Sequence, residues 1–115
     1  MTTLKIDGGK SAGDFKKEFS LNFPFLKIEL YVDSAETGKA KNLISLGNQQ
    51  EIGEGTSTLE FDDLTTIREL KSILQKQGIK ALVFRKSGAL WIETSLTDDW
   101  SLRKQNHEAE LINKA

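Results

Sequence analysis

The sequence predicts a single α+β domain, and three observations lead to this fold class. The chain has 115 residues, the usual size of one domain with one hydrophobic core. Apolar residues alternate with polar ones in some segments and recur every three or four positions in others, as in strands and helices. Residues 3–30 align with residues 58–85 at a constant offset, without a gap and with a shared pattern. We therefore expect 1–115 to fold as one unit around an internal repeat.

Each copy of the repeat is predicted to form a strand, a helix and a second strand. A short apolar strand ends in Asp in both copies, and a hydroxyl residue follows with an acid three positions later. These residues are Ser11 and Asp14 in the first copy, and Thr66 and Glu69 in the second. Such pairs are typical of helix N-termini, and Thr66 with Glu69 has the complete form of a capping box.

The two predicted helices end where the sequence becomes unfavourable for helix. Pro24 disfavours helical geometry at Phe23, and Gly78 is a natural residue to follow a helix C-terminus. Each helix carries one apolar stripe, made of Phe15, Phe19 and Phe23 in the first and of Ile67, Leu70, Ile73 and Leu74 in the second.

Strands follow both helices. Residues 25–32 alternate apolar and polar side chains, and residues 81–86 are apolar on both faces. Ser87 and Gly88 are predicted to form a two-residue turn that leads into a further strand over 89–94. Two copies in tandem with this extra strand predict a ferredoxin-like βαββαβ two-layer sandwich. A β-grasp is the alternative, because residues 66–71 resemble the helix opening of ubiquitin-like domains.

Two segments lie outside the repeat. Residues 33–57 are rich in Gly and are predicted to be a flexible insert, in which Leu43, Ile44 and Leu46 are compatible with a short strand. Residues 97–115 are predicted to be a C-terminal helix or tail. Its helix covers roughly 98–113, is capped by Thr97, and places Trp100, His107 and Leu111 along one narrow face.

The composition excludes several kinds of chemistry. The chain has no Cys and one His, so disulfides, Cys-ligated zinc, iron–sulfur clusters, thiol nucleophiles and multi-His metal sites are ruled out. The 16 basic and 17 acidic residues give a net charge of -1, which argues against nucleic acid as a partner. No apolar stretch approaches a membrane span, so we expect a cytoplasmic protein with no cofactor.

The predicted hairpin identifies a candidate interaction surface. With Ser87 and Gly88 as the turn, Phe84 lies opposite Trp91 on one face of the sheet, together with Leu82. Ala81, Val83, Leu90 and Ile92 lie on the other face and are predicted to be core. Helices cover one face of a two-layer sheet, so the aromatic pair is expected on the uncovered face. The predicted interaction surface consists of Tyr31, Leu82, Phe84, Trp91 and Trp100.

Four explanations of the aromatic pair are open. The C-terminal segment could fold back so that Trp100 packs on it, or two copies of the chain could meet through the sheet face. Another protein or a small ligand could bind there, or bases of a nucleic acid could stack on the rings. The strand 82–85 lacks the Gly-aromatic spacing of RNA-recognition sheets, which weighs against the last.

Single polar residues carry weaker signals. His107 is alone on a polar segment and is predicted to be a solvated surface histidine. Asp98 and Asp99 are predicted to complement a helix dipole rather than to bind a cation. We expect no catalytic residue.

Two stretches resemble a family of small, uncharacterised bacterial proteins. These stretches are residues 23–29 and a C-terminal half that contains VFRKSG at 83–88, WIET at 91–94, TDDWSL at 97–102 and Gln105-Asn106. The resemblance implies a bacterial cytosolic setting and transfers no activity.

The sequence therefore predicts a non-enzymatic interaction or assembly module. Its partner would be a second copy of the chain or another protein. A ligand-sensing domain with the 34–57 loop as a lid is the alternative, and an enzyme of unknown class is the third possibility.

Overall fold

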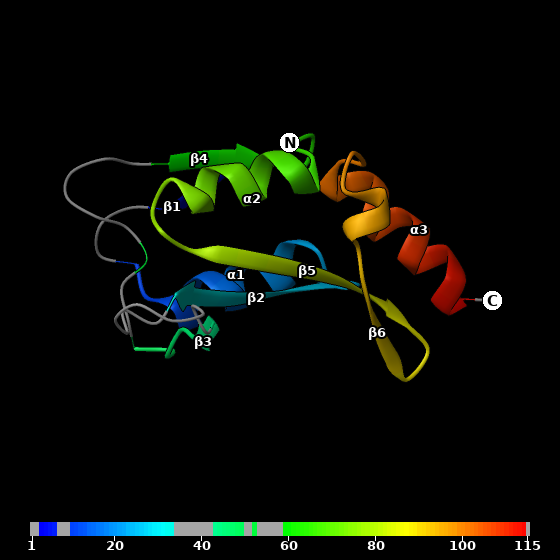
Figure 1. The fold of residues 1–115 in the computed structure, drawn as a ribbon. Coiled ribbons are helices and arrows are strands. Elements are labelled where there is room, and N and C mark those ends of the chain that lie inside the picture. The colour runs from blue at the N-terminus through cyan, green and yellow to red at the C-terminus, as the bar shows by residue number, and fades with distance from the viewer. Residues whose placement is uncertain (1–2, 7–9, 34–42, 50–51, 53–58, 115) are drawn as a thin grey trace.

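The chain folds into three α-helices and short strands that alternate along the sequence (Figure 1). The structure is a computed structural model and describes residues 3–6, 10–33, 43–49, 52 and 59–114. This arrangement confirms the predicted α+β class. The elements in chain order are β1 (Thr3–Ile6), α1 (Ala12–Asn22), β2 (Leu26–Asp33), β3 (Leu43–Ser45), β4 (Leu59–Asp62), α2 (Ile67–Gln75), β5 (Lys80–Ser87), β6 (Leu90–Glu93), the 3-10 helix η1 (Ser95–Thr97) and α3 (Leu102–Lys114).

The strands of the described chain lie in two antiparallel sheets. One sheet has the order β3-β2-β5-β6, and the other consists of β1 and β4. The single sheet of a ferredoxin-like or β-grasp fold is therefore not what the structure shows. The reason is that β1 and β4 pair with each other, and their apolar side chains enter the core from this separate ribbon: Leu4, Ile6 and Phe61.

The two predicted copies pair strand for strand. β1 pairs with β4 and β2 pairs with β5. Lys5 lies opposite Glu60 and Ile28 lies opposite Val83, and in both pairs the residues are 55 positions apart, as 60 − 5 and 83 − 28 show. The β1–β4 pair and the β2–β5 pair are thus each centred on two residues that are equivalent in the alignment of the copies. Descent from a duplicated ancestor stays a prediction.

The helix starts and ends follow the predicted local signals. The Ser11 hydroxyl accepts a hydrogen bond from the Asp14 amide, and Thr66 and Glu69 form the complete capping box. At the end of α2 the Ile79 amide donates to the Leu74 carbonyl across Gly78, whose φ is +77°. This bond is typical of a helix that ends in a left-handed glycine.

One hydrophobic core joins the two ribbons and the helices. It contains the apolar stripes of α1 and α2 and the inward residues of β2 and β5; the fully buried large side chains are Phe15, Phe19, Ile6, Leu26, Ile28, Ile52, Ile67, Leu70, Leu74, Leu102, Gln105 and Val83. The presence of Ile52 shows that the described part of the 33–57 insert is tied to the core. Its amide donates to the Lys10 carbonyl at 2.9 Å, and the Asn48 carbonyl accepts from Gly13 at 3.0 Å. Most of the predicted flexible insert lies outside the described residues.

The C-terminal helix differs from its prediction in its start and in its buried face. It begins at Leu102 rather than near residue 98, because the Ser101 hydroxyl accepts from the Lys104 amide and caps it. The buried face consists of Leu102, Gln105 and Ala109, whereas the predicted face of Trp100, His107 and Leu111 is half-buried or exposed. None of the described helices is long and apolar enough to cross a membrane.

Candidate interaction surface

Four of the five predicted surface residues lie on one face of the four-stranded sheet. Tyr31, Leu82 and Phe84 are half-buried, and Trp91 is 39% exposed. Their cross-strand partners place all four on the face opposite the core. The sequence therefore assigned this face correctly.

The hairpin register differs from the prediction by two residues. Ser87 pairs with Leu90, so Gly88 and Ala89 form the turn, and Trp91 lies opposite Lys86 rather than Phe84. Gly88 adopts a φ of +61°, which suits the first position of such a turn. A shift of two positions leaves every side chain on its predicted face, because the side-chain period of a strand is two.

Lys27 lies between the two aromatic rings of this face. Its Nζ is 5.2 Å from the Phe84 ring centroid and 5.1 Å from that of Trp91. Phe84 is the cross-strand neighbour of Lys27 in the sheet. The rings are therefore engaged by a cation and its aliphatic stem, which reduces their value as an open apolar patch.

Trp100 does not join this surface, and that part of the prediction is wrong. Its ring lies 4.5 Å from Lys104 Nζ and 6.0 Å from the Arg85 guanidinium carbon. Arg85 pairs with Leu26 and with Ile92, so it belongs to the core face of the sheet. The C-terminal segment thus packs on the opposite face of the sheet, and Lys27 contacts Phe84 and Trp91.

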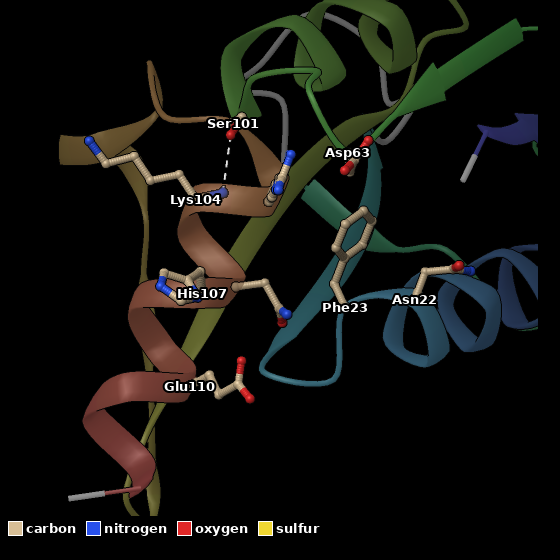
Figure 2. A pocket seen from close by; sticks show the side chains of 9 residues that line it. Asn22, Phe23, Asp63, Ser101, Lys104, His107 and Glu110 are labelled. Atoms are coloured by element: carbon tan, nitrogen blue, oxygen red, sulfur yellow. Dashed lines mark hydrogen bonds between the residues drawn. The ribbon is translucent and has the colours of Figure 1, made fainter. Parts of the chain in front are cut away.

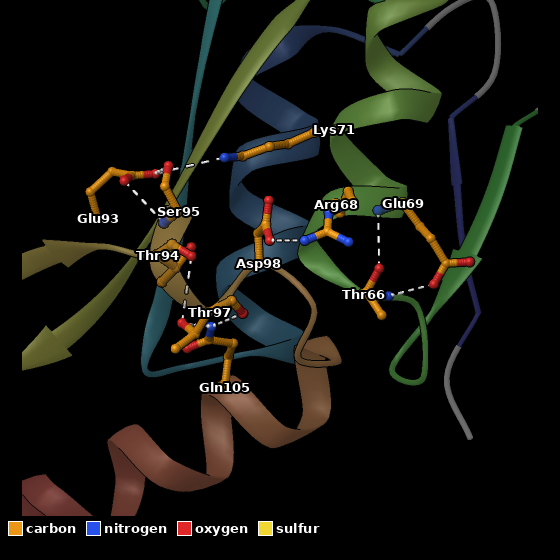
Figure 3. A network of polar contacts seen from close by, with 10 residues as sticks. All are labelled: Thr66, Arg68, Glu69, Lys71, Glu93, Thr94, Ser95, Thr97, Asp98 and Gln105. Carbon is orange, nitrogen blue, oxygen red and sulfur yellow. Dashed lines mark hydrogen bonds and ion pairs between the residues drawn. The ribbon is translucent and has the colours of Figure 1, made fainter.

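The two glutamates of the face are paired with lysines of the helices. Glu29 lies 3.4 Å from Lys16 of α1. Glu93 lies 3.7 Å from Lys71 of α2, as Figure 3 shows. Burial raises the pKa of Glu93, but hydrogen bonds from the hydroxyl and amide of Ser95, with the charge of Lys71, outweigh it and hold the pKa below its ordinary value. Glu93 is therefore a fixed negative charge at the end of β6.

The outer edge of β6 is the most apolar exposed feature of the described chain. β6 ends the strand order, and its residues Leu90 and Ile92 are 68% and 40% exposed. Leu96 in η1, three residues beyond β6, is 99% exposed. The sequence predicted Leu90 and Ile92 as core, and this is wrong because both side chains are exposed on the edge strand of the sheet. The missed signal was Leu90-Trp91-Ile92, three apolar residues in a row on a terminal strand.

A cavity of about 590 Å³ lies between the end of α1 and α3 (Figure 2). Asp63, Arg103 and His107 are among the residues that line it, so acidic and basic groups are mixed. His107 is exposed, as predicted, and Glu110 of the same helix also lines the cavity. Within the described residues no group of three or more His, Asp or Glu side chains is placed to hold a metal ion.

A second cavity, of about 630 Å³, lies beside the start of β5. Lys71 and Gln75 of α2 and Ser95 of η1 form part of its lining. The loop predicted as a ligand lid, residues 34–57, is described only at 43–49 and 52, and neither piece lines this cavity.

Comparisons with protein-family models, curated proteins and solved structures find no match for this chain. The resemblance to small bacterial proteins therefore stays an expectation.

Several residues of that resemblance have structural roles. The Thr94 hydroxyl donates to the Val83 carbonyl at 2.8 Å, and the Gln105 amide nitrogen donates to the Thr97 carbonyl at 2.9 Å. Asn106 Oδ1 accepts from the Phe25 amide at 2.9 Å. These side chains hold the C-terminal half against the sheet.

Proposed function

We propose that the protein is a non-enzymatic assembly module that associates through the exposed edge of β6. The observation that carries this proposal is the run Leu90-Trp91-Ile92 on an edge strand, where all three side chains are exposed. Edge strands present unpaired backbone groups, and natural proteins usually protect them with charged residues, Pro or a covering segment. β6 contains no Pro, and its one charged residue, Glu93, lies at the end of the strand, so the apolar run itself is unprotected, as expected of a strand that is used for pairing.

The distribution of exposed apolar residues also supports an interaction site near β6. Eight large apolar residues are exposed in the described chain, and four of them lie between residues 90 and 96. Two more, Leu111 and Ile112, lie on the last turns of α3, which Asn113 ties to the hairpin through bonds to Gly88 and Lys86. Exposed apolar surface gathered in one region is typical of an interaction site.

The proposal moves the interaction surface from the sheet face to the sheet edge. Lys27 Nζ lies near the Phe84 and Trp91 rings, and Phe84 and Leu82 on the face are half-buried, whereas Leu90 at the edge is 68% exposed. A four-residue edge is small by the standards of stable interfaces, which bury about 1,200–2,000 Å². We therefore expect association that is weak and depends on concentration.

Sedimentation velocity over a range of protein concentrations tests the proposal. We expect the mean sedimentation coefficient to rise with concentration up to about 1 mM, where an interaction of about −4 kcal/mol becomes visible. The variant Ile92→Lys should remain monomeric because it places a charge on the apolar edge. Leu21→Lys is the matched control, since Leu21 is 72% exposed on α1, and it should associate like the unchanged chain. A chain that is strictly monomeric throughout this range would contradict the proposal.

A further inference from the structure

The backbone of β6 directs alternate residues toward β5 and away from it. The Thr94 amide donates to the Val83 carbonyl at 3.1 Å, which makes this a hydrogen-bonded pair of the antiparallel ladder. Counting back by twos, Ile92 and Leu90 also bond to β5, so the N–H and C=O groups of Trp91 and Glu93 point outward. No other strand of the described chain lies beyond this edge.

Two outward residues separated by one position can pair with themselves in a second copy. In an antiparallel arrangement with its two-fold axis at Ile92, Trp91 of each copy forms a hydrogen-bonded pair with Glu93 of the other. Two such pairs form at once. An axis at Trp91 or at Glu93 would give one pair of these residues, so the arrangement centred on Ile92 satisfies the most outward backbone groups.

The side chains favour the same register. With the axis at Ile92, the two Ile92 side chains lie opposite each other, and each exposed Trp91 lies beside a Glu93 of the second copy. With the axis at Glu93, two carboxylates would face each other across the strands, and opposed like charges destabilise a sheet. Glu93 is already held in place by Lys71 and Ser95, so it cannot turn away without losing those bonds.

We infer that the partner of the β6 edge is a second copy of this chain, which pairs antiparallel through β6 about a two-fold axis at Ile92. Two four-stranded sheets then become one continuous sheet. The inference rests on the proposed function and adds the two-fold symmetry and the register of the pairing.

Single-cysteine variants test the register, because the chain has no Cys of its own. In the proposed dimer Ile92 sits in a non-hydrogen-bonded pair with its counterpart, where the Cα atoms are about 4.5 Å apart, within the range of a disulfide. Ile92→Cys should therefore form a disulfide-linked dimer under mild oxidation. Leu90→Cys is the matched control: its thiol is on the same face of the same strand, but it lies opposite residue 94, and it should remain unlinked.

Hydrogen exchange of the unchanged chain provides a second measurement that needs no variant. The Trp91 and Glu93 amides should exchange more slowly as concentration rises, by about twofold when half of the chains are paired. The Ile92 amide already bonds to β5 and should change little.

The outcomes separate the inference from the proposed function. Linkage at Ile92 but not at Leu90, with slowed exchange at Trp91 and Glu93, supports the inferred dimer. A chain that associates without linkage at Ile92, or with equal linkage at Leu90, overturns the register and leaves the assembly module standing. A strict monomer overturns both.

Discussion

Lys27 determines how the two aromatic residues of the sheet face can be used. Its ammonium group lies about equally far from the Phe84 and Trp91 ring centroids, at 5.2 and 5.1 Å. A base or another aromatic ring could stack on this face only after Lys27 moved away. The position of one lysine thus explains why a chain can carry this aromatic pair on the surface of a sheet.

Replacing Lys27 tests this role. Lys27→Ala should lower the free energy of unfolding by roughly 0.5–1.5 kcal/mol, because it removes the cation and the stem that packs on the rings. Urea denaturation followed by circular dichroism measures this difference. Lys17→Ala, at an exposed position of α1, is the control and should change stability by less than about 0.5 kcal/mol. Equal effects of the two variants would show that the ring contacts contribute nothing.

At the scale of elements, the starts of α2 and α3 satisfy each other's backbone groups. The Ile67 and Arg68 amides of α2 donate to the carbonyls of Trp100 and Asp98. In the reverse direction, the Leu102 and Arg103 amides of α3 donate to the carbonyls of Thr65 and Asp63. The first amides of a helix have no hydrogen-bond partner within it. The segment before each of these two helices therefore supplies carbonyl acceptors for the first amides of the other.

The capping box of α2 is therefore expected to affect both helices. Thr66→Ala should destabilise the protein by about 1 kcal/mol, within the range of 0.5–2 kcal/mol for N-caps, because the Glu69 amide loses its acceptor. Thr66→Ser keeps the hydroxyl and should stay within a few tenths of a kcal/mol of the unchanged chain. Chemical denaturation compares the variants, and equal stability of all three would exclude a capping contribution.

At the scale of the whole molecule, the C-terminal segment is part of the core rather than a tail. Leu102 belongs to the hydrophobic core, and Gln105 and Ala109 are completely buried. The same segment supplies the carbonyls that complete α2. The molecule should consequently unfold as one cooperative unit.

Truncation tests this unity. Removal of residues 98–115 should cost about 5 kcal/mol or more, comparable with the whole stability of a small domain, and should abolish cooperative thermal unfolding by circular dichroism. Removal of residues 111–115 alone keeps the buried residues and both sets of caps. This control should still unfold cooperatively, with only the contact from Asn113 to the hairpin lost. Cooperative unfolding of the longer truncation would show that the C-terminal segment is dispensable.

The local structure could be read from the sequence because its causes are local. Ser11, Thr66 and Gly78 start or end helices through bonds to residues within a few positions, and all three act as predicted. Alternation in β2 assigned the buried face of that strand, and the period of two kept the hairpin faces correct even though the register was shifted.

The tertiary structure alone decided which strands pair and which apolar residues are covered. β1 pairs with β4 outside the larger sheet, although their sequence patterns suit either arrangement, because alternation specifies a face and not a partner. Leu90 and Ile92 carry the same signal as core residues, yet they are exposed on the edge strand of the sheet. Trp100 lies by Arg85, outside the helix, because Ser101 rather than Thr97 caps α3. The sequence by itself determined the starts of α1 and α2 and the two faces of the long strands, because these depend on contacts between residues a few positions apart. The pairing of the strands, their register and the exposure of their side chains depend on contacts between residues far apart in the chain. Such contacts exist only in the packed tertiary structure.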